Sequence, residues 1–326
     1  MEFGFVREGE ILTPNGRGRP PEMLELLPDA AHFAGIKLTG DALYAAVVDL
    51  RAKTIHTEEH VLQSRDVDAV VDLIASTVNG LRARFSRLTA VGVCLAGDVH
   101  EVDGAAVVEG SWFLGWESVP LASLVSSATG LPTSVANDVH ALTAAHHWFG
   151  AGVGCSSLAL IGLGAGIGAG IVVRDELVTG ANGHPGKVSH IPVADTGPRC
   201  DRGHVGCASS FVTMPAIVRN AGAEPGGYDE AVRRATSGDE RALAAFHAAG
   251  TALGVVIAQI VNLIDPQKVI VTGEGLGIFD FARADVDEAI ATWLDPSDAP
   301  IAVEVQAFRF ADYAWAAAVG TIRALI

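Results

Sequence analysis

The order of the predicted elements is the same in both halves of the chain, and this repetition restricts the fold more than any single motif does. In the first half, three short apolar or β-branched runs precede a helix capped by Asp66 and then a continuous apolar run. These runs are residues 32–37, 42–50, 54–62 and 88–95. The second half predicts the strands 156–163, 166–174, 268–272 and 301–308 and the helices 240–264 and 312–326. Two similar α/β halves predict a cleft between them, where ligands usually bind.

Length and charge restrict the partners of the chain. Its 326 residues fit two lobes of ordinary size, and its 49% hydrophobic and 18% charged residues are typical of a globular protein. The 38 Asp and Glu residues against 22 Lys and Arg residues give a formal net charge of −16. A body this acidic repels phosphate backbones and anionic membranes. DNA contact is therefore expected only from a local patch or a segment outside this sequence, and no membrane contact is expected.

The cysteines indicate a cytoplasmic location with reduced thiols. There are four of them, which is too few for a disulfide scaffold, and the N-terminus does not resemble a signal peptide. The uncharged stretch 148–173 is long enough to span a bilayer. It contains eight glycines, which make a poor helix, so we expect a glycine-rich pair of strands there.

Several motifs occur together that are typical of one family. The most specific is the segment 180–190, which ends in Gly-His-Pro-Gly-Lys-Val-Ser-His and is followed by Cys200-Asp-Arg-Gly-His-Val-Gly-Cys207. Asn137 and Asp138 open a predicted helix after a short strand. From about residue 16 onward the chain resembles the ROK family (repressors, open reading frames and sugar kinases). The resemblance implies an α/β, actin-like/hexokinase-like (ribonuclease H-like) two-lobed fold.

The resemblance also implies a division of the chain into three parts. Residues 1–34 are expected to be the remnant of a winged-helix wing and its linker. Residues 35–133 together with 312–326 are expected to form the N-terminal lobe, and residues 134–311 the C-terminal lobe.

The ROK family contains both kinases and regulators, so the phosphate-handling positions bear on function. Where family kinases read Asp-x-Gly-Gly-Thr, this chain reads Lys37-Leu-Thr-Gly-Asp41. The cationic Lys37 therefore replaces the carboxylate near the metal, and the anionic Asp41 replaces the hydroxyl near the phosphate. Ala165 replaces a hydroxyl residue of the second phosphate loop, and Glu274 replaces a glycine near the adenine. A carboxylate about 4 Å from a phosphate oxygen costs several kcal/mol. ATP and Mg²⁺ are therefore not expected as cofactors, which argues against an active sugar kinase.

The sugar-binding positions of the family are partly retained. Asn137, Asp138 and His190 stand where the family's sugar contacts stand, and Asp138 is the catalytic base only if the chain is a kinase. Lys187 replaces a ligand Glu, and Ser209 stands where another Glu follows the last Cys. The expected ligand-binding residues are Asn137, Asp138, Lys187 and His190, and the cationic Lys187 favours an acidic or phosphorylated ligand. The alternative reading of Asp138 is an ordinary helix N-cap.

A structural zinc ion is the other cofactor that the resemblance implies. The family's site takes one His and three Cys, of which His190, Cys200 and Cys207 are present, whereas Arg202 occupies the middle Cys position. A structural zinc site needs four ligands, and His204 could supply the fourth. The alternative is a loop held by packing, with two free thiols.

The N-terminal segment points to the regulator branch of the family. Residues 17–21 and 24–28 resemble the segment that joins a winged helix-turn-helix to the sugar-binding body of family repressors, and residues 5–11 resemble the last strand and wing of that head. The recognition helices are not in this sequence, so either the gene start lies further upstream or the chain is a headless relative. A disordered basic leader is the alternative.

The sequence therefore predicts a ROK-family, sugar-responsive transcriptional regulator. A small sugar or sugar-derived effector is expected to close the two lobes within a homodimer or tetramer, and DNA is expected to bind only through an N-terminal head. One alternative is an ATP-dependent hexose or amino-sugar kinase with Asp138 as base. The other is a headless sugar sensor that acts through a protein partner.

Overall fold

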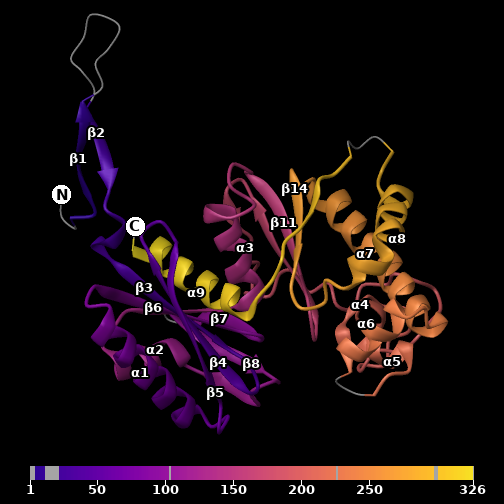
Figure 1. The fold of residues 1–326 in the computed structure, drawn as a ribbon, viewed down its shortest axis with the longest axis horizontal. Coiled ribbons are helices and arrows are strands. Elements are labelled where there is room, and N and C mark those ends of the chain that lie inside the picture. Colours follow the sequence, from indigo (N-terminus) through magenta and orange to yellow (C-terminus); the bar gives the residue numbers. More distant parts are fainter. Residues whose placement is uncertain (1–3, 12–21, 103, 225–226, 297–299, 326) are drawn as a thin grey trace, which may run out of the picture. The chain divides into compact units, whose positions relative to one another are not determined.

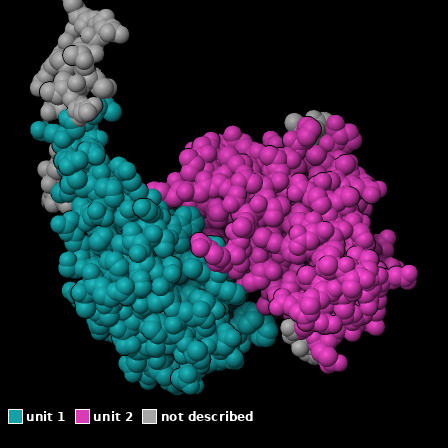
Figure 2. All heavy atoms as spheres, in the orientation of Figure 1, with its two compact units in different colours: residues 1–141, 310–326 teal, residues 142–309 magenta. Residues whose placement is uncertain are grey.

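A computed structural model describes residues 4–11, 22–102, 104–224, 227–296 and 300–325. The chain divides into two compact units, Met1–Ala141 with Phe310–Ile326 (unit 1) and Leu142–Arg309 (unit 2), which Figure 2 colours separately. The segment 17–21, which was predicted to join the DNA-binding head to the body and contains Arg17 and Arg19, lies outside the described residues.

Unit 1 is built on a five-stranded sheet in the order β10-β6-β3-β4-β5. Its strands are β3 (His32–Leu38), β4 (Ala42–Asp49), β5 (Thr54–Val61), β6 (Leu88–Leu95) and β10 (Thr133–Asn137). β3 pairs antiparallel with β4 and parallel with β6, and β6 pairs parallel with β10. The carboxyl ends of β3, β6 and β10 therefore meet at one edge of the sheet, and the predicted residues Lys37, Asn137 and Asp138 come from that edge.

Helices cover both faces of this sheet (Figure 1). They are α1 (Val67–Arg84), α2 (Leu121–Thr129) and α9 (Phe310–Leu325). Asp66 caps α1 as predicted, because its Oδ1 accepts from the N–H groups of Asp68 and Ala69. α9 lies directly on β3, where a Cβ atom on Gly35 would come within 2.9 Å of the Ala314 carbonyl carbon. Only glycine allows this close approach, which fixes α9 and its Tyr313 against the strand.

A two-stranded antiparallel hairpin precedes this sheet. It consists of β1 (Val6–Ile11) and β2 (Glu22–Leu26), with Val6 opposite Leu26. The Arg7 guanidinium and the Glu25 carboxylate form an ion pair of 2.7 Å across the two strands. The sequence predicts the first strand but not its partner, because residues 24–28 read as a linker. A short helical turn, η1 (Pro28–Ala30), leads into β3, and a three-stranded sheet of β7 (Asp98–Val102), β8 (Ala105–Ser111) and β9 (Trp116–Val119) completes unit 1.

Unit 2 contains the second five-stranded sheet, in the order β13-β12-β11-β14-β15. Its strands are β11 (Ser157–Leu163), β12 (Ile167–Val173), β13 (Glu176–Leu177), β14 (Lys268–Thr272) and β15 (Val303–Val305). β11 and β12 are the predicted glycine-rich pair within residues 148–173. The strand predicted over residues 301–308 is shorter than expected, since β15 lies at the sheet edge and pairs only with the five-residue β14.

Six helices of the described residues accompany this sheet: α3 (Asp138–Phe149), α4 (Ser209–Val212), α5 (Met214–Ala221), α6 (Tyr228–Thr236), α7 (Glu240–Ile264) and α8 (Ile278–Trp293). α7 has the bounds that the sequence predicts. It is long and apolar enough to cross a membrane, but 72% of its most apolar window is buried inside the unit. Its burial is that of a core helix, and its partners in the core include β11, β14 and α8.

Candidate functional site

The centre of the candidate site in unit 1 is a buried ion pair between Lys37 and Asp138. Lys37 lies near the end of β3, and Asp138 follows β10 as the first residue of α3. The Lys37 ammonium donates to Asp138 Oδ2, and the two side chains are only 4% and 9% exposed. The ammonium also lies 4.2 Å from the ring centroid of Tyr313, which adds a cation–π contact. Removing either charge would leave the other one buried without a partner, which would strongly destabilise the protein.

Asn137 and Asp138 have different local roles. Asn137 Oδ1 accepts from the N–H groups of Val139 (3.0 Å) and His140 (3.2 Å), and its Nδ2 donates to the Gly97 carbonyl at 2.9 Å. Asn137, and not Asp138, is therefore the side chain that caps α3. Asp138 Oδ1 accepts from the Val139 N–H at 2.9 Å. A carboxylate has about four acceptor positions, so Asp138 can still accept hydrogen bonds from a ligand.

The pairing of Lys37 with Asp138 is the site feature that sequence reasoning missed. The sequence places both residues at the carboxyl ends of strands and gives them opposite charges, which is the signal that could have predicted it. Cys94 lies beside the pair on β6, opposite Lys37 in the register. Burial raises the pKa of the Cys94 thiol to about 12, so this thiol stays protonated.

Hydrogen bonds from a side chain of the turn itself and from Arg65 hold the turn after β3. Thr39 Oγ1 donates to Asp41 Oδ1 at 2.7 Å, and Arg65 Nε donates to the Gly40 carbonyl at 2.6 Å. The carboxylate of Asp41 thus stands on the turn at which a family kinase has a hydroxyl. Phe113 lies beside this turn, because a Cβ atom on Gly40 would come within 3.3 Å of the Phe113 carbonyl oxygen.

The remaining predicted site residues belong to unit 2. Ala165 is exposed in the turn between β11 and β12, and Glu274 follows β14. Lys187 is exposed on the segment between β13 and α4, and Ser209 is the first residue of α4. The parts of Lys187 and His190 in ligand binding stay predictions, as do those of Asn137 and Asp138.

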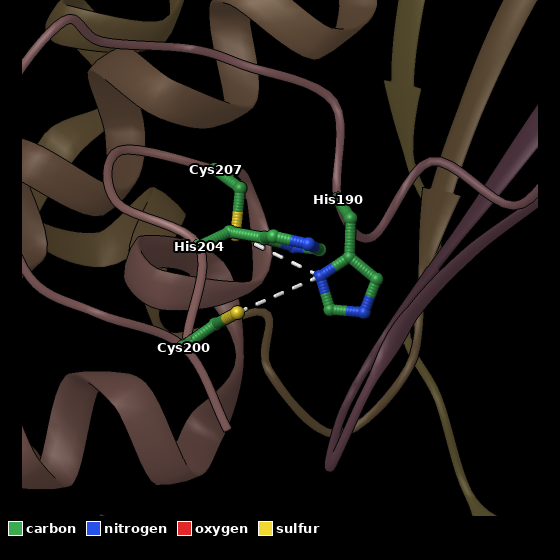
Figure 3. A group of neighbouring side chains, drawn as sticks. All are labelled: His190, Cys200, His204 and Cys207. Atoms are coloured by element: carbon green, nitrogen blue, oxygen red, sulfur yellow. Dashed lines mark hydrogen bonds between the residues drawn. The ribbon is translucent and has the colours of Figure 1, made fainter. Parts of the chain in front are cut away.

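A cluster of two histidines and two cysteines lies on the segment that precedes α4 (Figure 3). It contains His190, Cys200, His204 and Cys207, and their ligand atoms all lie within 4.8 Å of one another. His190 Nδ1 is 3.7 Å from the Sγ atoms of both Cys200 and Cys207. Arg202, in the middle position of the motif, is exposed and outside the cluster. The four residues that the sequence singles out for zinc are therefore brought together.

The donor set fits a zinc ion. With Zn–S bonds of about 2.3 Å and Zn–N bonds of about 2.0–2.1 Å, a tetrahedral site has its sulfur and nitrogen atoms about 3.6 Å apart, close to the 3.7 Å found here. Burial, with the nearby His204 and Arg202, lowers the pKa of His190, so its ring is neutral at pH 7 and able to ligate. Burial raises the pKa of the Cys207 thiol, and the metal charge would have to offset this to obtain the thiolate. Since Nδ1 faces the cysteines, Nε2 is the His190 nitrogen left for a second partner.

Comparison with solved structures defines the class of fold. The chain is similar to a ROK family glucokinase from Streptomyces griseus in complex with glucose and AMPPNP, at 26% identity and a TM-score of 0.73, covering 89% of this chain and 98% of that one. It is similar in fold to a ROK family transcriptional regulator homologous to the Escherichia coli MLC protein, at 22% identity and a TM-score of 0.80, covering 98% of this chain and 86% of that one. The fold is therefore the α/β, actin-like/hexokinase-like two-lobed fold.

Comparison of sequences then gives the family. The family model of ROK matches residues 33–321, and the chain belongs to the ROK family. Among curated relatives it is 24% identical to the DNA-binding transcriptional repressor Mlc of Escherichia coli (strain K12), over 83% of this chain and 70% of Mlc. It is 27% identical to the N-acetylglucosamine repressor of Escherichia coli O157:H7, over 84% of this chain and 71% of the repressor.

Proposed function

We propose that this chain is the effector-binding body of a transcriptional regulator that responds to a sugar or a sugar-derived ligand. The observation that carries the proposal is the buried ion pair between Lys37 and Asp138. In a sugar kinase a carboxylate at this place takes the proton of the attacking hydroxyl, and a general base must have its charge available for that proton. Here a fixed ammonium neutralises the carboxylate, so Asp138 is suited to orient a ligand hydroxyl and poorly suited to deprotonate it.

The relatives support a regulator. The curated relatives described above are repressors, and the solved regulator matches 98% of this chain, against 89% for the glucokinase. A match over 98% of the chain must include most of the β1–β2 hairpin, which precedes the part matched by the ROK family model. We assign this hairpin to the wing of a DNA-binding head, and DNA contact to that head, because the whole chain carries a formal charge of −16.

We infer the class of ligand from the charged and polar groups at the predicted ligand-binding positions. Asp138 in unit 1 can accept from hydroxyl groups, and in unit 2 the Nε2 atom of His190 and the ammonium of Lys187 can donate or pair with an anion. A sugar acid or a sugar phosphate supplies both kinds of group. Zinc on the cluster of His190, Cys200, His204 and Cys207 would hold the His190 ring in one orientation.

We place this regulator in the cytoplasm, and we propose that it acts as a homodimer or tetramer.

A thermal-shift screen of sugars, sugar acids and sugar phosphates tests the ligand. A ligand at a hundredfold excess over its Kd stabilises the protein by about 2.7 kcal/mol. His190→Ala and Asp138→Asn should each abolish the shift, and Lys187→Ala should abolish it for anionic ligands only. Asp72→Asn is the matched control, because Asp72 is an exposed aspartate of α1. A shift that survives both His190→Ala and Asp138→Asn would refute the assignment.

The second candidate function is an ATP-dependent hexose or amino-sugar kinase with Asp138 as base. The similarity to the glucokinase, at 26% identity, is the observation that favours it. Such an enzyme would release ADP in the presence of a hexose, and Asp138→Asn would abolish the release. We expect no ADP release from the wild-type chain.

A further inference from the structure

An exposed tryptophan, Trp112, lies on the turn that joins β8 to β9 in unit 1. The residue is 79% exposed, although tryptophan is usually well buried in folded proteins. Its ring centroid lies 4.1 Å from that of Phe113, with the two ring planes inclined by 36°. Phe113 therefore supports the indole on one side, while most of the indole surface faces solvent.

The turn that carries Trp112 is anchored at both of its ends. Ser111 is buried, and its Oγ donates to the Ala96 carbonyl at 2.8 Å. At the other end Trp116 is also buried, and its indole N–H donates to the Arg65 carbonyl at 2.6 Å. The indole of Trp112 is therefore held out from the surface by a fixed turn.

This turn lies close to the predicted ligand-binding residues of unit 1. The Asn137 side chain donates to the Gly97 carbonyl at 2.9 Å. A Cβ atom on Gly97 would come within 3.1 Å of Ser111 Cβ, so Gly97 packs directly against the residue that precedes Trp112. Gly97 thus separates the turn from Asn137, and Asp138 follows Asn137 in the chain. Trp112 stands at the same edge of the sheet as these two polar side chains.

An aromatic face beside hydrogen-bond acceptors is suited to a sugar ring. A pyranose carries its hydroxyl groups around the edge of the ring, and its faces present C–H groups that can pack on an indole. Asp138 has acceptor positions left for hydroxyl groups at that edge. An open-chain sugar acid or polyol carries similar hydroxyl groups but has no flat apolar face. The pairing of Trp112 with Asp138 therefore favours a ring over a chain.

We propose that Trp112 is the platform on which the ligand stacks, and that the ligand is therefore a sugar in its closed pyranose form. The inference rests on the proposed function and deepens it, because it separates cyclic sugar acids and sugar phosphates from their open-chain counterparts. Phe113 supports the indole, and Asp138 accepts from the hydroxyl groups of the stacked ring.

Calorimetric titration with two pairs of anionic probes tests the proposal. One pair is glucuronate and gluconate, and the other is glucose 6-phosphate and glucitol 6-phosphate. The two members of each pair carry the same kind of charged group, but only the first member is a ring. The proteins are wild type, Trp112→Ala and, as the matched control, Trp293→Ala, because Trp293 is a 58% exposed tryptophan at the end of α8 in unit 2.

We expect wild type to bind the ring of at least one pair with a Kd at least about tenfold lower than that of its open-chain partner, because stacking removes apolar surface from water. Trp112→Ala should lose this preference, and Trp293→Ala should keep it. Thermal melting without ligand should give the same Tm for all three proteins, since both tryptophans are exposed.

Trp112→Phe distinguishes a stacking platform from a structural role. A phenyl ring still offers an aromatic face, so this variant should keep most of the affinity for the ring. It should lose the change in tryptophan fluorescence that a saturating cyclic probe causes in wild type, whereas Trp293→Phe should keep that change.

Three results would overturn the proposal. They are wild type that binds no cyclic probe, wild type that binds the open-chain partners as tightly as the rings, and Trp112→Ala that binds the rings as tightly as wild type. The last result would leave the indole to a macromolecular partner. None of the three decides the proposed function, which is tested separately by the full thermal-shift screen and by ADP release.

Discussion

Replacing Lys37 by methionine should destabilise the protein strongly, because it leaves the Asp138 carboxylate buried without its cation. Both side chains are less than a tenth exposed, so water cannot solvate the remaining charge. Removing one partner of a buried ion pair costs about 3–5 kcal/mol, and the lost contact with the Tyr313 ring contributes to that cost. At about 2–4 °C per kcal/mol for a unit of this size, Tm should fall by about 6–20 °C.

The assay is urea unfolding of wild type, Lys37→Met and the double variant Lys37→Met/Asp138→Leu. Replacing both partners by apolar groups of similar volume is often neutral, so the double variant should recover most of the lost stability. Glu304→Gln is the control, because the ion pair of Glu304 with Lys268 is 2.8 Å long but has side chains 39% and 25% exposed. Breaking that partly exposed pair should cost at most about 1 kcal/mol.

The reasoning is refuted if Lys37→Met loses less than about 1 kcal/mol, the cost expected of an exposed pair. It is also refuted if the double variant is no more stable than the single variant, since the penalty then does not come from an unpaired Asp138.

The remaining predictions concern the metal, a helix cap and the thiols. Protein purified without chelator should contain one zinc ion per chain by metal analysis, and Cys200→Ser with Cys207→Ser should remove it; zinc that persists would show that other residues bind it. Asp66→Ala should lower the free energy of unfolding by about 1 kcal/mol, since Asp66 caps α1; an unchanged urea midpoint would contradict this. At pH 7 a thiol reagent should modify the partly exposed Cys155 but not Cys94, whose pKa is raised to about 12 by burial; mass spectrometry of the labelled peptides decides between them.

The regular elements could be predicted because their periodicity is long or their apolar runs are continuous. α7 and β14 have the bounds that the sequence predicts, since 25 residues of helical spacing in α7 and four buried residues in the five-residue β14 leave little choice. β15 is shorter than predicted because pairing with a neighbouring strand, and not local sequence, ends an edge strand. The sequence did not predict β2 for a related reason, since β2 is a strand only through its pairing with β1.

The sequence could single out the residues of the candidate site, but it could not predict which of them contact one another. The two histidines and two cysteines of the cluster share one short segment and a motif spacing, so sequence alone could group them, including His204. Lys37 and Asp138 are 101 residues apart, and only the order of the strands brings them together. The same holds for the Glu274 side chain, which packs against Gly164 because β11 and β14 are neighbouring strands.

The most direct test of the central claim, that this fold binds a sugar-like ligand without phosphoryl transfer, is a calorimetric titration of wild type with the ligand found by thermal shift. The titration is done with and without ATP and Mg²⁺, and each sample is then analysed for ADP. The account predicts the same Kd within about twofold under both conditions, a difference of less than about 0.5 kcal/mol, and no ADP. A Kd that falls at least about tenfold with ATP and Mg²⁺, or ADP that disappears with Asp138→Asn, would contradict it.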